Sequence, residues 1–162
     1  MDKDLIKFLI MEVDGTLTDG KIYMGNTGEL CKAFDAKDGL GISMLAIPNG
    51  IEPIILTGRM SNIVVNRCKE LGIQRIYQGI RDKKSELCKQ IDDLSVAAYI
   101  GDDLNDLECM QMIKTHGGII GCPADAASAV IKIADFVSPH DGGSGAVRDF
   151  IEWIIDRGDR RR

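Results

Sequence analysis

Several features that define whole classes of proteins are scarce in this sequence. The five cysteines are odd in number and widely spaced, and no two form a Cys-X-X-Cys pair, which argues against a zinc site and a disulfide framework. Reduced thiols in the core of a cytoplasmic protein are the simplest interpretation. The two histidines, His116 and His140, have no partners at the spacing of metal ligands, so we expect both to be structural.

An excess of positive charge and long apolar runs are also missing. Twenty Lys and Arg against 25 Asp and Glu give a net charge of −5, so neither nucleic acid nor a membrane is an expected partner. The apolar run near the N-terminus is interrupted by charge, is too short to span a membrane and lacks the flanks of a signal peptide. We therefore expect a cytoplasmic protein.

The apolar content that is present is enough for one core. Of the 162 residues, 44% are hydrophobic, and this length is typical of one domain, which we place at 1–156, followed by a basic tail at 157–162. Short apolar runs alternate with helical patterns along the whole chain. The predicted strands lie at 6–13, 52–58, 75–79, 96–103, 117–121 and 134–138, and the predicted helices at 39–47, 61–72, 83–91, 104–113, 125–133 and 145–155.

This alternation predicts the fold class. Strands that alternate with helices form a parallel sheet covered by helices on both faces, which is a Rossmann-like, three-layer α/β fold. Two short strand patterns around the turn residues 26–28 add a β-hairpin at about 20–35, after the first strand.

Polar residues close four of the predicted strands. They are Glu12 and Asp14 after the first strand, Thr57, Gly58 and Arg59 after the second, Lys83 after the third, and Asp102, Asp103, Asn105 and Asp106 after the fourth. Ligands bind at the carboxyl ends of such strands. Carboxylate oxygens there suit Mg²⁺. Thr57 and Lys83 are suited to hydrogen-bond and neutralise phosphoryl oxygens.

Four segments carry a resemblance to a known family. EVDGTLTDG, ILTGR, the lysine of GIRDK and IGDDLND resemble, in order and spacing, the four motifs of the haloacid-dehalogenase (HAD) superfamily of phosphatases. More narrowly, the chain is similar to 3-deoxy-D-manno-octulosonate 8-phosphate (KDO 8-phosphate) phosphatases. The hairpin and the segments FDAKDGLGI, GRMS and GGSGAVRDF support this narrower resemblance.

The resemblance implies a HAD-like fold and a Mg²⁺-dependent phosphomonoesterase that releases KDO and phosphate, a step in bacterial lipopolysaccharide synthesis. It implies a nucleophile at Glu12 and a general acid and base at Asp14. The metal ligands would be Glu12, Asp102 and the backbone carbonyl of Asp14, with Asp103 or Asp106 in support. Phosphate would bind Thr57 and Lys83, and Gly58, Arg59 and Asn105 would also contact the substrate.

Arg59 is suited to a further role, because a guanidinium beside the phosphate site is able to pair a sugar-acid carboxylate through two hydrogen bonds. Lys37, Asp38, Ser61 and Arg148, with the glycine-rich stretch 142–145, are additional candidates for substrate contact.

Glu12 departs from the family pattern, in which this acid is Asp. The extra methylene moves the carboxylate outward by about 1 Å, and a misplacement of that order costs roughly 100-fold in rate. An engineered trap, a natural weakening and an adapted nucleophile all agree with the sequence.

The spacing of the motifs leaves no room for a cap domain. The stretch between Asp14 and Thr57 already holds the hairpin and one helix, and the next interval holds one helix and one strand. Since phosphoryl transfer works best with water excluded, we expect a partner subunit to cover the site. The resembling phosphatases are homotetramers that pack through their hairpins. Ile22, Tyr23, Met24 and Leu30 would make that contact, unless they pack on their own domain.

Two other functions compete with this one. The first is a phosphatase for a nine-carbon acid, 2-keto-3-deoxynononate 9-phosphate or N-acylneuraminate 9-phosphate. In similar enzymes for those substrates a glutamate tends to follow the Thr-Gly of the second motif, so Arg59 favours the eight-carbon substrate. The second is a phosphate-binding module that lost its nucleophile at Glu12.

Overall fold

The computed structural model describes residues 6–159. At its centre is a six-stranded sheet in the order β5-β4-β1-β6-β7-β8, and each neighbouring pair of strands is parallel. The strands span Phe8–Met11 (β1), Glu52–Leu56 (β4), Arg75–Tyr77 (β5), Ala97–Ile100 (β6), Ile119–Cys122 (β7) and Phe136–Val137 (β8). The expected parallel sheet is therefore confirmed, with strands shorter than the apolar runs suggested.

Both faces of the sheet are buried, because successive side chains of a strand point to opposite faces. In β1, Leu9 and Met11 belong to one hydrophobic cluster and Ile10 to the other. In β4, Ile55 joins the first cluster and Ile54 the second. A sheet with two apolar faces needs a helical layer on each.

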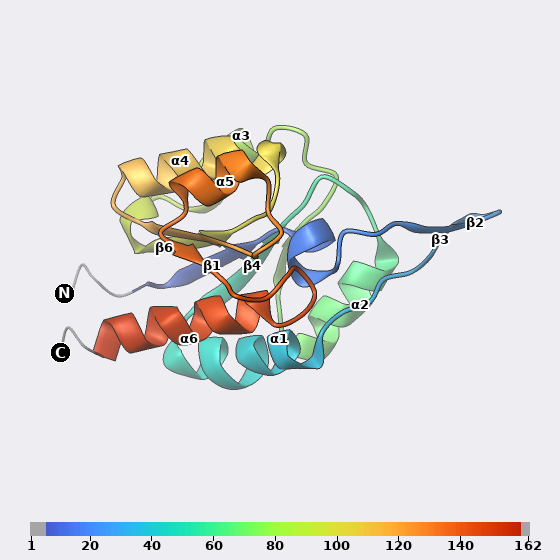
Figure 1. Ribbon diagram of the computed structural model, residues 1–162, viewed down its shortest axis with the longest axis horizontal. Helices are drawn as coiled ribbons and strands as arrows, with labels where there is room; N and C mark the ends of the chain where they lie inside the picture. The colour runs from blue at the N-terminus through green and yellow to red at the C-terminus, as the bar shows by residue number, and fades with distance from the viewer. Residues whose placement is uncertain (1–5, 160–162) are drawn as a thin grey trace.

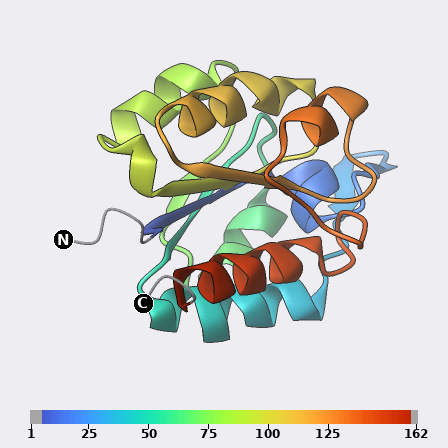
Figure 2. The same cartoon turned by 60° about the vertical axis from the view of Figure 1, so that its left-hand side comes forward.

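Those layers are present (Figure 1 and Figure 2). One face is covered by α1 (Ala36–Leu40), α2 (Asn62–Leu71) and α6 (Ala146–Asp159), and the other by α3 (Lys83–Gln90), α4 (Leu107–Thr115) and α5 (Ser128–Ile133). Val64 of α2 and Phe150 of α6 enter the first cluster, while Leu87 of α3 and Cys109 of α4 enter the second. The result is the predicted three-layer α/β fold.

The first helix begins earlier and runs longer than the apolar pattern 39–47 indicated. The carboxylate of Asp35 accepts a hydrogen bond of 2.6 Å from the backbone N–H of Lys37, which caps the start of α1. Beyond α1 the chain continues through the helical turns η2 (Gly41–Ala46) and η3 (Ile47–Asn49) and ends at Gly50 in the left-handed conformation. Further helical turns are η1 (Val13–Leu17), η4 (Leu94–Val96) and η5 (Leu104–Asp106).

The last helix differs from the expected boundary at 156. It continues through Asp159, so residues 157–159 are helical and not part of a tail. The guanidinium carbon of Arg157 lies 5.1 Å from the centre of the Trp153 ring, a cation–π contact that favours this last turn. The remainder of the expected basic tail, 160–162, lies outside the described residues. Within 6–159, no helix is both long and apolar enough to cross a membrane.

The hairpin projects beyond the sheet (Figure 1). Its strands β2 (Tyr23–Gly25) and β3 (Gly28–Cys31) pair antiparallel, within the predicted range of about 20–35. The base of this hairpin returns towards the ends of β1 and β4, which brings two of its side chains to the candidate site.

Candidate active site at the strand ends

The topology brings the predicted polar residues to one edge of the sheet. Since β5, β4, β1 and β6 are neighbours and parallel, the residues that follow them meet at their carboxyl ends. Glu12 follows β1, Thr57 follows β4, Lys83 begins α3 after β5, and Asp102 follows β6. Gly58, Arg59 and Asn105 lie exposed on the loops and turns after β4 and β6.

Glu12, Thr57 and Lys83 form one buried cluster, with relative exposures of 4%, 2% and 4%. Oε1 of Glu12 accepts hydrogen bonds from the Thr57 hydroxyl at 2.5 Å and from the backbone N–H of Val13 at 2.8 Å. Oε2 of Glu12 pairs with the ammonium of Lys83. Both carboxylate oxygens of Glu12 therefore contact the two groups expected to bind phosphate.

Asp106 anchors Lys83 from the other side. Its fully buried carboxylate accepts a bond of 2.7 Å from Lys83 Nζ and another of 2.7 Å from the Tyr99 hydroxyl. Burial raises the pKa of Tyr99 well above its ordinary value, so the phenol remains a donor. The second oxygen of Asp106 accepts from the backbone N–H groups of Asp102 and Asp103, at 3.1 and 3.3 Å. Asp106 thus orients both the lysine and the loop after β6.

Asp103 is an exposed residue at the start of η5, where its carboxylate accepts a bond of 2.7 Å from the backbone N–H of Leu104. Of the two residues expected to support the metal-binding acid, Asp106 therefore makes the buried contacts and Asp103 caps the following turn.

Asp102 lies against the loop after β1. Its Oδ1 accepts a bond of 2.8 Å from the Thr16 hydroxyl. Gly15 has φ of +93°, and a Cβ on Gly15 would lie 2.1 Å from Oδ2 of Asp102, so this close approach requires glycine. Burial raises the pKa of Asp102 to about 7. A divalent cation beside this carboxylate would favour its ionised form.

The donor set fits Mg²⁺. No cluster of three or more His, Cys, Asp or Glu side chains suited to holding a metal ion occurs among residues 6–159. Mg²⁺ does not need one, because it usually binds one or two carboxylates and completes its shell with waters and phosphate oxygens. The carboxylates of Glu12 and Asp102 and the backbone carbonyl of Asp14 are oxygen donors of this kind.

Asp14 belongs to a second charged group, which we call the rim network: Asp14, Lys32, Glu29 and Arg59. The buried ammonium of Lys32 pairs with Asp14 and lies 3.0 Å from Oε1 of Glu29. Arg59 lies 3.3 Å from the same oxygen of Glu29 and 3.6 Å from Oδ2 of Asp14. Opposite charges thus alternate around a closed ring that joins the β1 loop, the hairpin and the β4 loop.

Lys32 and Glu29 are functional candidates that sequence reasoning missed. Both lie in the hairpin segment, whose strand pattern carries no sign that two of its side chains return to the site. Burial opposes ionisation of Glu29, but hydrogen bonds from Ser61, Lys32 and Arg59 outweigh it and lower the pKa of Glu29. The hydroxyl of Ser61 lies 2.5 Å from Oε2 of Glu29, so this further candidate joins the rim network through Glu29.

Comparison with known proteins decides the family. No protein-family model matches the chain. The 3-deoxy-D-manno-octulosonate 8-phosphate phosphatase KdsC of Escherichia coli K12 is 42% identical over 154 residues, which cover 93% of this chain and 79% of the relative. The chain belongs to the KDO 8-phosphate phosphatase family.

Solved structures agree with this membership. The KDO 8-phosphate phosphatase of Moraxella catarrhalis, crystallised with magnesium, phosphate and KDO, superimposes with a TM-score of 0.87 at 38% identity, covering 96% of this chain and 89% of that one. A HAD superfamily hydrolase from Legionella pneumophila gives a TM-score of 0.84 at 34% identity, covering 98% and 87%. The expected HAD-like fold is therefore confirmed.

Two further candidates for substrate contact, Asp38 and Arg148, make structural contacts in this KDO 8-phosphate phosphatase family member. Asp38 is 1% exposed, and its Oδ1 accepts a bond of 2.8 Å from the backbone N–H of Arg148 in the first turn of α6. Arg148 itself pairs with Glu152, one turn further along the helix, at 2.6 Å. Asp38 therefore caps α6, and burial raises its pKa to about 6.

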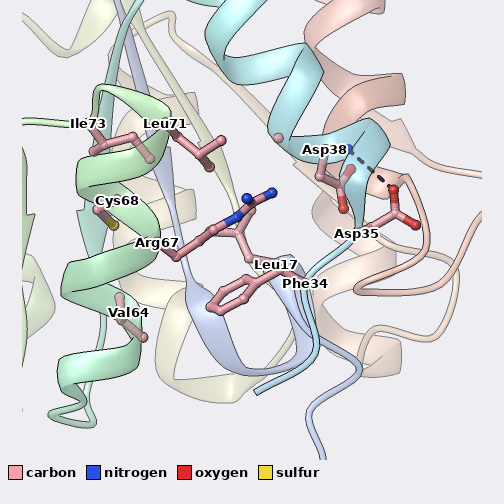
Figure 3. A pocket seen from close by; sticks show the side chains of 10 residues that line it. Leu17, Phe34, Asp35, Asp38, Val64, Arg67, Cys68, Leu71 and Ile73 are labelled. Carbon is pink, nitrogen blue, oxygen red and sulfur yellow. Dashed lines mark hydrogen bonds between the residues drawn. The ribbon is translucent and has the colours of Figure 1, made fainter. Parts of the chain in front are cut away.

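Asp38 also lines a small pocket between α1 and α2, with Arg67 reaching across it towards Phe34 (Figure 3). The guanidinium carbon of Arg67 lies 5.9 Å from the centre of the Phe34 ring. The pocket volume is about 10 Å³, which holds roughly one water and no sugar. The glycine-rich stretch, by contrast, contacts the site: the N–H of Gly143 donates to the carbonyl of Thr16 at 3.0 Å.

Proposed function

We propose that this protein hydrolyses the phosphate monoester of KDO 8-phosphate and releases KDO and inorganic phosphate, with Mg²⁺ as cofactor. The observation that carries the proposal is the convergence of Glu12, Thr57, Lys83 and Asp102 at the carboxyl ends of neighbouring parallel strands. The KDO 8-phosphate phosphatases among its relatives support the substrate.

In this mechanism the side chains at the strand ends divide the work. Thr57 and Lys83 hold the phosphoryl oxygens, assisted by the backbone at Gly58. Glu12 stands at the nucleophile position and would form an acyl-phosphate as the sugar oxygen departs. In its protonated form Asp14 gives a proton to that leaving oxygen, and as the carboxylate it then removes a proton from the water that cleaves the acyl-phosphate, which restores the protonated form.

Mg²⁺ would be held by the carboxylates of Glu12 and Asp102 and the backbone carbonyl of Asp14, and it would supply positive charge against the phosphoryl oxygens. Asp106 supports this arrangement by orienting Lys83 and the loop that carries Asp102. Asp103 supports it by capping the turn that follows this loop. Lys32 keeps Asp14 in place at the rim.

Arg59 and Asn105 would contact the sugar acid. The side chain of Arg59 is 45% exposed, and it already pairs with carboxylates, which supports a role in reading the substrate carboxylate. The nine-carbon acids remain the competing substrates, and Arg59 after the second motif's Thr-Gly favours the eight-carbon one.

A homotetramer built through the hairpins is part of this proposal. Four apolar hairpin residues are exposed on the described chain, and these exposures favour intermolecular contact over packing on their own domain: Ile22 at 40%, Tyr23 at 37%, Met24 at 59% and Leu30 at 65%. Light scattering coupled to size-exclusion chromatography tests it, and charged residues in place of Met24 and Leu30 should dissociate the tetramer. The cytoplasmic location stays a prediction.

A phosphate-binding module of low turnover is the second candidate, and one observation favours it: both carboxylate oxygens of Glu12 are engaged by Thr57 and Lys83. Phosphate release from a panel of eight- and nine-carbon sugar-acid phosphates, with MgCl2 or with EDTA, separates the possibilities. The proposal requires Mg²⁺-dependent release that is fastest with KDO 8-phosphate. If no substrate releases phosphate faster than the buffer control, the binding module is favoured instead.

A further inference from the structure

The Glu12 side chain makes contacts that a phosphoryl group would need. Its Oε1 accepts the Thr57 hydroxyl at 2.5 Å, and its Oε2 pairs with Lys83. A phosphoryl oxygen that accepts the Thr57 hydroxyl proton must therefore displace Oε1 of Glu12. One that binds Lys83 meets an ammonium already paired with two carboxylates, those of Glu12 and Asp106.

The contacts of Glu12 are well shielded from water. The side chains of Lys83 and Glu12 are 4% and 5% exposed, and Thr57 is 2% exposed as a residue. Hydrogen bonds to charged groups are stronger than those between neutral groups, and breaking a buried ion pair without replacing it is costly. An incoming phosphate thus competes with a strong internal ligand.

The length of the Glu12 side chain permits its simultaneous contacts with Thr57 and Lys83. Glu12 follows directly on β1, whose last residue, Met11, is fixed in the sheet between β4 and β6. An aspartate at this position would be shorter by one C–C bond, about 1.5 Å, and would keep the same charge. We therefore expect an aspartate not to contact Thr57 and Lys83 together.

We propose that Glu12 acts as an internal ligand of Thr57 and Lys83, which weakens the binding of inorganic phosphate and of the substrate's phosphoryl group by competing for both side chains. This inference rests on the proposed function only in assigning phosphate to Thr57 and Lys83. It makes Glu12 a residue that sets the affinity of the site for phosphate.

The experiment measures binding of inorganic phosphate by isothermal titration calorimetry, once in EDTA and once in saturating MgCl2. The arm in EDTA keeps the result independent of any change in metal binding. We expect Glu12→Asp to bind phosphate at least about tenfold more tightly than the parent in both buffers, because two charge-assisted contacts no longer compete.

Two further variants make the result specific. Glu12→Ala removes the carboxylate and should also tighten phosphate binding at least about tenfold in EDTA, which keeps the test decisive if Glu12→Asp does not fold. Glu52→Asp is the matched control. Glu52 begins β4, at the end of the strand far from Thr57, so this substitution should leave the phosphate affinity unchanged within about twofold. If neither Glu12 variant binds phosphate more tightly than the parent, the inference is wrong.

Binding and turnover separate this inference from the proposed function. Tighter phosphate binding by Glu12→Asp, together with no phosphate release from any sugar-acid phosphate, upholds the inference and overturns the proposed function. Faster release by Glu12→Asp with unchanged phosphate affinity upholds the function and overturns the inference.

Discussion

The ammonium of Lys32, on the hairpin, pairs with the carboxylate of Asp14, in the loop after β1. The Lys32 side chain is 1% exposed and the Asp14 side chain 16%, so this ion pair is shielded where the proposed acid and base meets the substrate. A hairpin that looks peripheral in the fold is thereby connected to the chemistry at the strand ends.

Lys32→Met should lower turnover at least about tenfold, since general acid–base catalysis contributes roughly 100-fold or more and depends on the position of Asp14. Lys32→Arg should restore part of it, because a guanidinium keeps the charge. Initial rates of phosphate release, with thermal unfolding to check the fold, measure both.

Lys21→Met is the control. It changes an exposed hairpin lysine, and its turnover should stay within about twofold of the parent. Equal rates for Lys32→Met and Lys21→Met would contradict the role of Lys32.

Glu12→Asp should raise phosphatase turnover at least about tenfold, because the shorter side chain restores the distance for in-line attack on phosphorus. The affinity for magnesium should change little, since the carboxylate is retained. Steady-state rates at several MgCl2 concentrations give both quantities. The same turnover in the two proteins would mean that Glu12 does not impair the attack.

Gly15→Ala should destabilise the fold by about 1–3 kcal/mol and reduce activity, because its backbone is left-handed and the new methyl would collide with Asp102. Urea unfolding at fixed pH measures the loss. Gly50→Ala is the matched control: its φ is also positive, at +77°, but nothing lies within 4 Å of the added Cβ. A loss no larger for Gly15 than for Gly50 would show that the contact with Asp102 is unimportant for stability.

Asp38 should make the stability of the protein depend on pH. Its pKa is about 6 in the fold and 3.8 in the reference state, so between about pH 4 and pH 6 the folded chain binds more protons than the unfolded one. The free energy of unfolding therefore falls as pH rises through this window, and the fall from this group between pH 4.5 and pH 7 is roughly 2 kcal/mol.

Asp38→Asn keeps an oxygen to accept the Arg148 N–H and removes the titration. Urea unfolding of parent and variant at pH 4.5 and pH 7 isolates the contribution, because all other titrating groups are shared. The parent should lose more stability than Asp38→Asn over this interval. Parallel pH profiles would show that Asp38 does not titrate in the folded state.

Local sequence was sufficient for most of the elements. Ile10 and Ile54 lie in runs of apolar residues that remain strands because both faces of the sheet are covered. The helix α2 stops where predicted, at Gly72, whose left-handed φ of +80° ends it. The start of α1 at Ala36 was not predicted, since its first turn depends on the Asp35 cap and not on apolar spacing.

The sequence by itself determined which polar residues meet, because parallel strands in a fixed order bring their carboxyl ends to one edge. Only the tertiary structure decided what these side chains touch. Glu12 reaches Thr57 and Lys83 across 45 and 71 residues of chain. Lys32 contacts Asp14 because the hairpin folds back onto the site. Asp38 is buried and caps α6. Such contacts depend on side-chain reach and packing between distant segments, for which local patterns carry no signal.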